Sequence, residues 1–227
     1  MKMRYATTAD IEQILAITDS ARRFQRQCGF RQWEDGYPAY DNIAADIAAQ
    51  GAYIFEYDSI AAESVKESAV AEGTSADIAA ERAWNSEGES VANKGVYNAE
   101  EHGIIAYAYL TGGDAEYDRL SGIWHYPGPY GVIHRLAIAP GFRGQGLAAQ
   151  ILAMSEAHLA AQGTRAMRID TGQDNIVMQR ILSRADYTCR GLHHFTWGPR
   201  LAYEKPLTQP LNCTPKVRHK TFGVHYV

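Results

Sequence analysis

The chain has 227 residues, which is enough for one large domain or for one domain with an insertion. Hydrophobic residues make up 46% of it and charged residues 21%, a balance that argues against wholesale disorder. A formal net charge of −4 argues against a nucleic-acid binder and against binding to anionic membranes, because both partners select a basic face.

Cysteine usage and the lack of long apolar runs favour a cytoplasmic protein without a metal site. Cys28, Cys189 and Cys213 have neither a CxxC nor a metal-ligand spacing, so no disulfide or zinc framework is expected. Free thiols fit a reducing cytosol. Residues 1–10 contain no apolar run that would serve as a secretory signal, and no segment approaches the roughly 18 apolar residues of a membrane span.

Five elements are predicted before residue 111. They are a strand over Met3–Ala6, a helix from Thr7 or Thr8 to a stop at Gly29, a helix from Asp41 to Gly51, and strands over Ala52–Tyr57 and Ile104–Leu110. The first helix is indicated by apolar residues at helical spacing, and a threonine hydroxyl is expected to cap its first turn. An aromatic loop over Cys28–Pro38 joins the two helices.

Two stretches of this half lack the pattern of a regular helix or strand. Residues 58–103 are rich in Ala, Glu and Ser and are net acidic, so we predict a helical or partly mobile insertion there. A stretch from Gly112 to Pro129 is expected to be a loop that holds Tyr117, Trp124 and Tyr126.

The second half predicts a regular alternation of strands and helices. Its elements are a strand over Val132–Ile138, a helix over Gln145–Gln162 with a stop at Gly163, a strand over Ala166–Thr171, a helix over Asn175–Arg184, and strands over Tyr187–Leu192 and Leu201–Lys205. The whole order is mixed, so it predicts a single α/β or α+β domain over residues 1–205, built on one sheet rather than on a doubly wound array. Residues 206–227 are expected to form an extended tail.

The segment after the strand Val132–Ile138 carries the strongest chemical signal. Its backbone amides at the loop Arg143–Gly146 and in the first helical turn lack intrahelical acceptors, and with the positive end of the helix dipole they form a receptor for phosphate or pyrophosphate. Gly144 and Gly146 have no side chains to keep an anion off the backbone, and Arg143 adds a charge-assisted donor. A glycine turn that merely joins a strand to a helix is the plain alternative.

Other nucleotide-binding loops fit this segment poorly, but one family resemblance fits it well. The P-loop Gly-Lys-Ser/Thr ending and the three-glycine dinucleotide fingerprint are both missing, which disfavours nucleoside triphosphates and NAD. Arg143-x-x-Gly146-x-Ala148 resembles the Arg/Gln-x-x-Gly-x-Gly/Ala signature of the GNAT superfamily of acetyl-CoA-dependent N-acyltransferases. Leu136–Pro140 is similar to the apolar strand that precedes this signature in the family and ends in proline.

The resemblance continues downstream of the signature. Arg168–Asn175 and the helix that ends at Asp186-Tyr187 are similar to the strand–Asn–helix–Gly-Phe segment of the family. The likeness spans roughly Arg4 to Lys205 and is tightest from Val132 to Tyr187. It implies the GNAT fold, in which a central, mostly antiparallel sheet contains a splayed strand pair and carries helices on both faces.

The resemblance also implies acetyl-CoA as the cofactor and assigns its binding residues. These are Leu136, Ala137 and Ile138 along the pantetheine arm, Arg143, Gly144, Gln145, Gly146, Leu147, Ala148 and Ala149 at the pyrophosphate, and Asn175 near the thiol. From the residue type alone, Asn175 is equally a helix N-cap, and the two roles are compatible.

The implied reaction is direct attack of a neutral amine on the acetyl thioester. An amine with a pKa of about 10 is mostly protonated at neutral pH, so a group of the protein must accept a proton. His134 is the candidate base, because it lies on the central strand two residues before Leu136. A hydrogen-bonded structural histidine is the alternative. Arg135 is expected on the opposite face of the strand, in a structural ion pair.

One position departs from the family pattern. Many GNAT enzymes carry a tyrosine on the helix before the Gly-Phe-like turn, which is thought to protonate the departing sulfur, and Leu182 occupies that position here. Another tyrosine then serves, or the thiolate leaves unassisted, or the protein is a poor catalyst.

The acceptor site is expected to lie between the first two helices and the later strand loops. Trp33, Glu34 and Tyr37 are the leading residues for it, with Asp35, Tyr40, Trp124, Tyr126 and Tyr130 as further candidates. Aromatic faces and carboxylates attract a protonated amine, although such loop residues also simply close the edge of a core. The predicted partner is a small-molecule or peptide amine, and a homodimer is conceivable.

Two other interpretations of the function remain. A GNAT-fold module that binds CoA or acyl-CoA without turnover is favoured slightly by Leu182 and by the acidic insertion. A phosphate-binding protein unrelated to CoA is the third.

Overall fold

A computed structural model describes residues 1–33, 35–57, 103–120 and 122–208. Seven strands form one sheet: β1 Lys2–Tyr5, β2 Ala52–Glu56, β3 Ile104–Thr111, β4 Tyr130–Ile138, β5 Ala166–Thr171, β6 Thr188–Phe195 and β7 Gly198–Pro206. The helices are α1 Ile11–Gln27, α2 Tyr40–Ala48, α6 Ala115–Arg119, α7 Leu147–Ala161 and α8 Ile176–Arg184, with single 3-10 turns at Thr8–Asp10 and Pro140–Phe142.

The sheet has the strand order β1-β2-β3-β4-β5-β7-β6. Every neighbouring pair is antiparallel except β4 and β5, which are parallel. Pairing of β4 with β5 stops after Val132 and Arg168, although β4 runs on to Ile138 and β5 to Thr171. The two strands therefore separate toward their carboxyl ends, which confirms the predicted mostly antiparallel sheet with a splayed pair.

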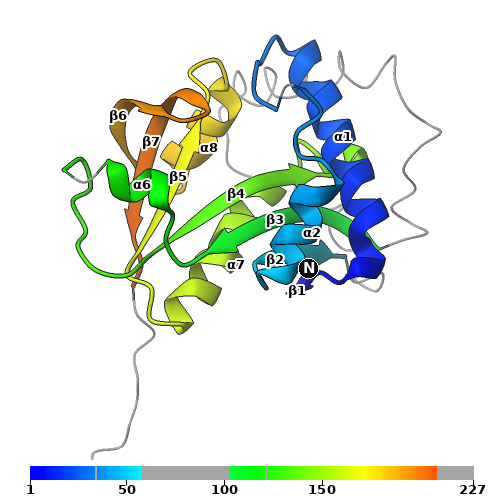
Figure 1. Ribbon diagram of the computed structural model, residues 1–227, viewed down its shortest axis with the longest axis horizontal. Helices are drawn as coiled ribbons and strands as arrows, with labels where there is room; N and C mark the ends of the chain where they lie inside the picture. The colour runs from blue at the N-terminus through cyan, green and yellow to red at the C-terminus, as the bar shows by residue number, and fades with distance from the viewer. Residues whose placement is uncertain (34, 58–102, 121, 209–227) are drawn as a thin grey trace, which may run out of the picture.

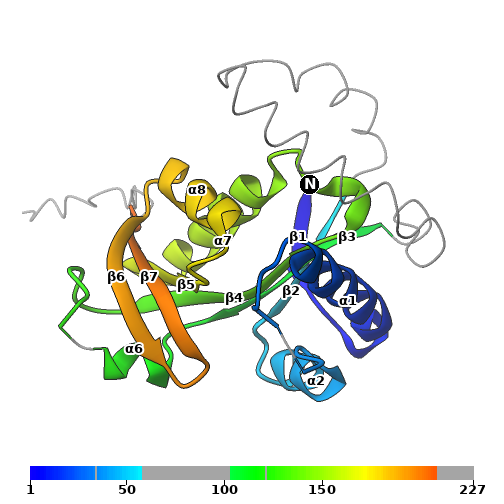
Figure 2. The same ribbon diagram turned by 90° about the horizontal axis from the view of Figure 1, so that it is seen from above.

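The sheet is covered on both faces, and each face has its own core. Figure 2 shows α1 and α2 on one side of the sheet and α7 and α8 on the other. On the first side, Ile14 and Ile17 of α1 pack with Ile43 of α2 against the sheet, and all three are fully buried. On the second side, Ile151 of α7 and Leu182 of α8 are buried in a larger cluster.

Most elements lie where the hydrophobic periodicity predicts them. Gly29 and Gly163 follow α1 and α7 with φ of 78° and 88°, the left-handed conformation that ends a helix. The short helix α6 is a correction, because Gly112 to Pro129 was expected to be a loop. It is one and a half turns long and is capped by Asp114, so it carries almost no periodic signal. The predicted insertion lies outside the described residues except for Gly103, and the tail beyond residue 208 lies outside them entirely.

Arg135 does not lie on the face that simple alternation predicts. Tyr109 pairs with His134 while Tyr107 pairs with Ala137, so β4 carries an extra residue, and Arg135 has a φ of 54°. This bulge places His134 and Arg135 on the same face of the sheet, the one that α1 and α2 cover. The expectation of opposite faces is therefore wrong, since strand periodicity fails where a residue is inserted into one strand of a pair.

Among the described residues, no helix is long and apolar enough to cross a bilayer. The same part of the chain contains no group of three or more His, Cys, Asp or Glu side chains that could hold a metal ion.

An acid-sensitive ion pair ties β1 to the start of α1. Arg4 donates to both carboxylate oxygens of Asp10 at 2.9 Å, and the Thr7 amide donates to the same carboxylate. The hydrogen bonds from Arg4 lower the pKa of Asp10 to about 2. Because the folded pKa lies below the unfolded value, this carboxylate stabilises the fold above about pH 4, and the contribution disappears as the pH falls toward 2.

We expect Asp10→Asn to lower the free energy of unfolding by about 1–2 kcal/mol at pH 6, allowing for the partly exposed Arg4. Urea unfolding of both proteins between pH 2 and pH 6 measures the difference, which should shrink steadily below pH 4. A difference that is independent of pH would show that the carboxylate charge is not the cause.

Candidate functional site

The loop between β4 and α7 presents a row of backbone amides. Gly144 and Gly146 both have left-handed backbone, with φ of 72° and 73°. Among the described residues, no backbone carbonyl accepts a hydrogen bond from the amides of Gly144, Gln145 or Gly146. The amides of Leu147, Ala148 and Ala149 follow in the first turn of α7, where helix geometry supplies no acceptor. These six amides and the helix dipole make a site for an anion.

Arg143 shapes this loop from one side. Its Nε donates to the carbonyl of Ile138 at 2.9 Å, its Nη2 donates to the Ser20 hydroxyl at 2.9 Å, and its guanidinium lies over the ring of Phe24. The side chain expected to meet a phosphate is thus bound to α1 and to the end of β4. It fixes the position of the loop relative to both elements.

The end of β4 has one sheet edge without a partner strand. Ala137 and Ile138 pair with Tyr107 and Ala106 of β3, but no residue of β4 beyond Val132 pairs with β5. The backbone groups of Leu136, Ala137 and Ile138 that face the split are therefore not used by the sheet. An extended amide-containing ligand arm would find hydrogen-bonding partners there.

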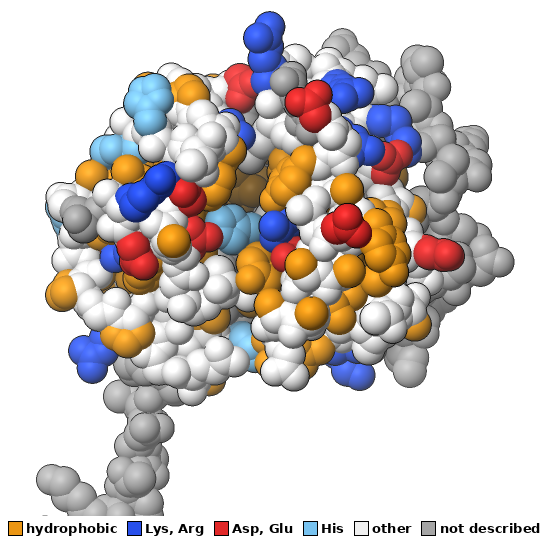
Figure 3. Space-filling view, in the orientation of Figure 1, with side chains coloured by type: hydrophobic (Ala, Val, Ile, Leu, Met, Phe, Trp, Pro, Cys, Tyr) orange, Lys and Arg blue, Asp and Glu red, His pale blue; other side chains and the backbone are white. Residues whose placement is uncertain are grey.

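A cavity of about 520 Å³ opens at the split and is lined from both faces of the sheet. One part of its wall is apolar, with Ile133, Leu136, Leu152, Ile169 and Met178. The other part carries charged and aromatic side chains, namely Arg31, Trp33, Asp35, Tyr37, Tyr109, Asp114, His134, Arg135, Asp170, Trp197 and Arg200. Figure 3 shows the opening near the centre of the molecule, with a histidine, an arginine and acidic side chains around it. A cavity of this size holds a small organic molecule.

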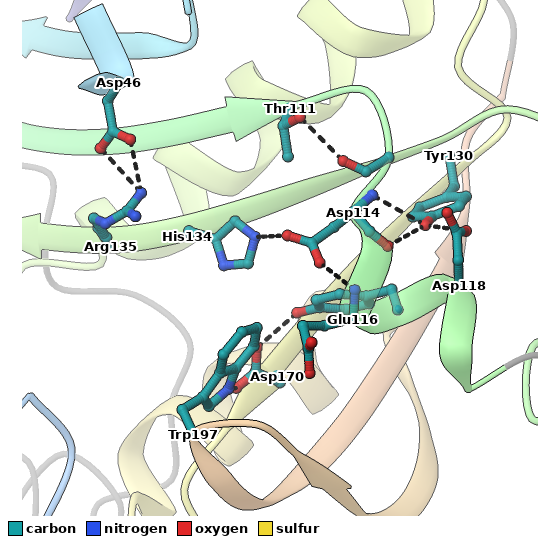
Figure 4. A network of polar contacts seen from close by, with 12 residues as sticks. Asp46, Thr111, Asp114, Glu116, Asp118, Tyr130, His134, Arg135, Asp170 and Trp197 are labelled. Carbon is teal, nitrogen blue, oxygen red and sulfur yellow. Dashed lines mark hydrogen bonds and ion pairs between the residues drawn. The ribbon is translucent and has the colours of Figure 1, made fainter. Parts of the chain in front are cut away.

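His134 and Asp114 form a hydrogen-bonded pair in the polar wall. His134 Nε2 lies 3.1 Å from Asp114 Oδ2, and Figure 4 shows the other ring nitrogen turned away from the carboxylate. An ionised carboxylate only accepts hydrogen bonds, so Nε2 carries the shared hydrogen and Nδ1 keeps a lone pair. Among the described residues no partner is found for Nδ1. The histidine is thus oriented with a free acceptor nitrogen, which is the arrangement of a general base.

Asp114 is held as a carboxylate by its position at the start of α6. Partial burial raises its pKa, but hydrogen bonds from His134 and from the Glu116 amide outweigh this and lower the pKa below the usual value. Tyr130 fixes the turn, since its hydroxyl donates to the Asp114 carbonyl at 2.9 Å. One feature of the sequence points to Asp114, because it is a helix-capping residue type that follows two glycines, but nothing in the sequence indicates that it faces His134.

Arg135 reaches the neighbouring part of the wall. Its Nη1 donates to both oxygens of Asp46 at 3.0 Å, which confirms the expected ion pair. Burial raises the pKa of Asp46, while the Tyr107 hydroxyl and the Arg135 guanidinium stabilise its charged form. The same guanidinium lies 5.4 Å from the centre of the Tyr37 ring and 5.0 Å from that of Tyr109.

The structure brings some of the expected acceptor residues to the cavity and leaves others away from it. Trp33 and Tyr37 line it, as does Asp35. Glu34 lies outside the described residues. The further candidates Trp124, Tyr126, Tyr130 and Tyr40 are not part of its wall. Trp124 and Tyr130 pack against Arg168 instead, and Tyr126 lies beside Arg190.

Asn175 caps α8 and also lines the cavity. Its side-chain oxygen accepts from the Met178 amide at 3.1 Å, and its side-chain nitrogen lies 3.4 Å from Gln32 Oε1. The capping role is therefore present, and the contact with Gln32 joins α8 to the aromatic loop after α1.

A second carboxylate group was missed by the sequence interpretation. Asp170 of β5 accepts from the Tyr117 hydroxyl at 2.7 Å and from the indole nitrogen of Trp197, which lies beside it in Figure 4, at 3.3 Å. It also pairs with Arg200 of β7. These residues come from three separate segments, namely α6, β5 and the hairpin of β6 and β7. Only the strand order, with β7 beside β5, brings them together.

The position of the missing tyrosine is filled by a core residue. Leu182 of α8 is fully buried and belongs to the cluster that packs α7 and α8 on the sheet. The tyrosines that line the cavity, among the described residues, are Tyr37 and Tyr109, and neither comes from α8. Burial raises the pKa of Tyr37.

Known proteins match this chain in sequence and in fold. The model of the acetyltransferase (GNAT) family matches residues 54–187. A GNAT family acetyltransferase from Streptococcus agalactiae superposes with a TM-score of 0.64 at 27% identity, over 90% of this chain and 94% of its own. A GNAT family acetyltransferase from Listeria monocytogenes gives 0.58 at 16% identity, over 91% and 94%. No protein of curated function matches significantly.

A further solved structure carries a ligand. It is a GNAT superfamily phosphinothricin acetyltransferase from Sinorhizobium meliloti in complex with acetyl-CoA, with a TM-score of 0.54 at 14% identity over 95% of this chain and 96% of its own. At that identity the likeness concerns the fold alone.

Proposed function

Since the chain belongs to the acetyltransferase (GNAT) family, we propose that it transfers the acetyl group of acetyl-CoA to a primary amine of a small molecule or peptide. The observation that carries the proposal is the continuity of three features: the unpartnered amides at the start of α7, the free edge of β4 and the cavity that contains His134. A pyrophosphate, an amide-containing arm and a thioester follow one another in the same order along CoA.

The residues present fit this cosubstrate. Gly144, Gln145 and Gly146, with Leu147, Ala148 and Ala149, would hold the pyrophosphate through backbone amides, on a loop that Arg143 fixes. Leu136, Ala137 and Ile138 would bind the pantetheine arm along the open edge of β4. Asn175 lies at the cavity near the place where the thiol arm would end. Bound acetyl-CoA supplies an activated acyl group.

The protein's part in the reaction is proton transfer, orientation and polarisation. His134 Nδ1 accepts a proton from the attacking amine nitrogen, directly or through water, while Asp114 stabilises the imidazolium that forms. A backbone amide at the end of β4 stabilises the negative charge that develops on the carbonyl oxygen, an effect of about 3 kcal/mol per donor. The carbon–sulfur bond then breaks, and CoA leaves with the electron pair as a thiolate. Trp33 and Tyr37 bound the space for the amine, with Glu34 beside them in the sequence.

Calorimetry tests whether the protein binds the proposed cosubstrate. We expect CoA and acetyl-CoA to bind the purified protein with a measurable heat and to raise its thermal midpoint as their concentration increases. No heat of association with either ligand at millimolar concentration would contradict the proposal, because the loop and the free strand edge would then serve another purpose.

The second candidate is a module that binds CoA or acyl-CoA without turnover, which Leu182 favours. Release of free thiol from acetyl-CoA in the presence of a panel of amines separates the two functions. Tight binding with no thiol release for any amine would support the module.

The location and assembly of the protein stay predictions. Cys28 and Cys189 are both free thiols, in keeping with the proposed cytoplasmic location. The homodimer rests on the sequence interpretation alone.

A further inference from the structure

Two of the three carboxylates that line the cavity, Asp114 and Asp170, are already supplied with donors from the chain itself, while Asp35 makes no hydrogen bond with the described residues. Asp170 accepts hydrogen bonds from Tyr117 and Trp197 and forms an ion pair with Arg200, and Asp114 accepts from His134 and the Glu116 amide. Asp114 and Asp170 therefore have little capacity left for a ligand that brings only donors.

Two arginines of the cavity wall, in contrast, have donors left over. Arg135 makes both of its bonds to Asp46 from Nη1, and Arg200 Nε lies 3.4 Å from Asp170 without the alignment of a hydrogen bond. Among the described residues, no carboxylate or carbonyl accepts a hydrogen bond from Nη2 of Arg135 or from either Nη atom of Arg200. A guanidinium nitrogen can only donate, so these Nη groups favour an acceptor. The Nε atoms of both residues also lack a partner, but they are fully buried, so a ligand in the cavity would meet the Nη groups.

Both arginines line the cavity, Arg135 from β4 and Arg200 from β7. Tyr37 lines it too and lies against Arg135.

From this excess of donors, and given the proposed acetyl transfer, we infer that the acceptor is a small amine that also carries an oxyanion, in the manner of a free amino acid, and that Arg135 and Arg200 bind this anionic group. The amine lies beside His134, and the oxyanion supplies the acceptors that the two arginines lack. A peptide amino terminus has an amide where the amino acid has its carboxylate, so it meets this requirement less well.

Matched acceptors test the inference directly. Thiol release from acetyl-CoA is measured with the twenty free amino acids, with their α-carboxamides, and with 1-aminoalkylphosphonates, which carry the oxyanion on phosphorus. The carboxamide has the less basic amine, more of which is neutral, so the chemistry alone favours it. We expect kcat/KM for at least one acid or phosphonate to exceed that of its carboxamide by about tenfold or more. Whichever class of acceptor reacts, carboxylate or phosphonate, identifies the oxyanion.

Arginine variants then locate the binding groups. Arg135→Lys and Arg200→Lys keep a positive charge beside Asp46 and Asp170 but lose the planar fork of donors. We expect each to raise KM for the anionic acceptor by about tenfold, with a smaller change in kcat. Arg190→Lys is the matched control, because Arg190 is also a largely buried arginine and is paired with Glu204 away from the cavity.

The possible failures are distinguishable. If carboxamides, peptides or simple amines react as well as the acids, or if both arginine variants lower kcat and leave the acid preference intact, the inference is wrong while the acetyl transfer stands. If CoA binds but no amine of any kind releases thiol, the proposed transfer fails and the inference fails with it.

Discussion

Replacing His134 by alanine is expected to lower kcat by about a hundredfold to ten-thousandfold, which is the range for loss of a general base. In the structure, His134 is the cavity residue that combines a carboxylate partner on one ring nitrogen with a free lone pair on the other. Without it, only the small neutral fraction of the amine reacts. The deficit should therefore shrink as the pH rises toward the pKa of the amine, at about 10.

The measurement is the initial rate of thiol release at saturating acetyl-CoA, between pH 6 and pH 9.5. His158→Ala is the matched control, since His158 is also half-buried and hydrogen-bonded, to Tyr53, but lies on α7 away from the cavity. CoA affinity should stay unchanged in both variants. If His134→Ala retains full activity with intact CoA binding, the histidine is a structural partner of Asp114, the alternative that the sequence left open.

Local signals made the loop between β4 and α7, the proposed anion site, predictable from the sequence. Pro140 ends a strand, Gly144 and Gly146 follow at close spacing, and a long helical pattern begins. Each of these features depends on neighbours within a few residues, so reading the chain in order is sufficient. The same holds for the cap of α8 at Asn175, where both the residue type and the following periodicity are visible.

The polar wall of the cavity could not be predicted in the same way. Asp114, Asp170 and Arg200 are far apart in the chain and meet only because the sheet places β3, β4, β5 and β7 side by side (Figure 1). Their contacts are thus a property of strand order, which a single sequence does not state.

The bulge at Arg135 could not be predicted from the sequence, for a different reason. Arginine has no preference for the left-handed conformation that it adopts here, so nothing in the sequence marks the inserted residue. Its consequence is large, because it turns two consecutive polar side chains, His134 and Arg135, toward the same cavity. The candidate base was therefore predicted, but its neighbour was assigned to the wrong face.

Substitution of Gly146 by alanine is expected to weaken CoA binding by about tenfold to a hundredfold, since that is the cost of losing one or more hydrogen bonds to a charged group. Gly146 has a φ of 73°, and a Cβ built there meets no protein atom within 4 Å. The fold therefore has room for the methyl group and loses only the roughly 1–2 kcal/mol of a left-handed non-glycine residue. Because the methyl group enters open space next to the Gly146 amide, it competes for room with an anion bound to that amide.

Gly163→Ala separates the two effects. Gly163 ends the same helix, has a φ of 88° and also has nothing within 4 Å of a built Cβ. The two variants should lose similar amounts of thermal stability, yet only Gly146→Ala should show a raised Kd for CoA by calorimetry. Equal CoA affinities in both variants would place the pyrophosphate elsewhere. A loss confined to Gly146→Ala would instead tie cofactor affinity to the amides at the start of α7, because helix and backbone strain are matched in the control.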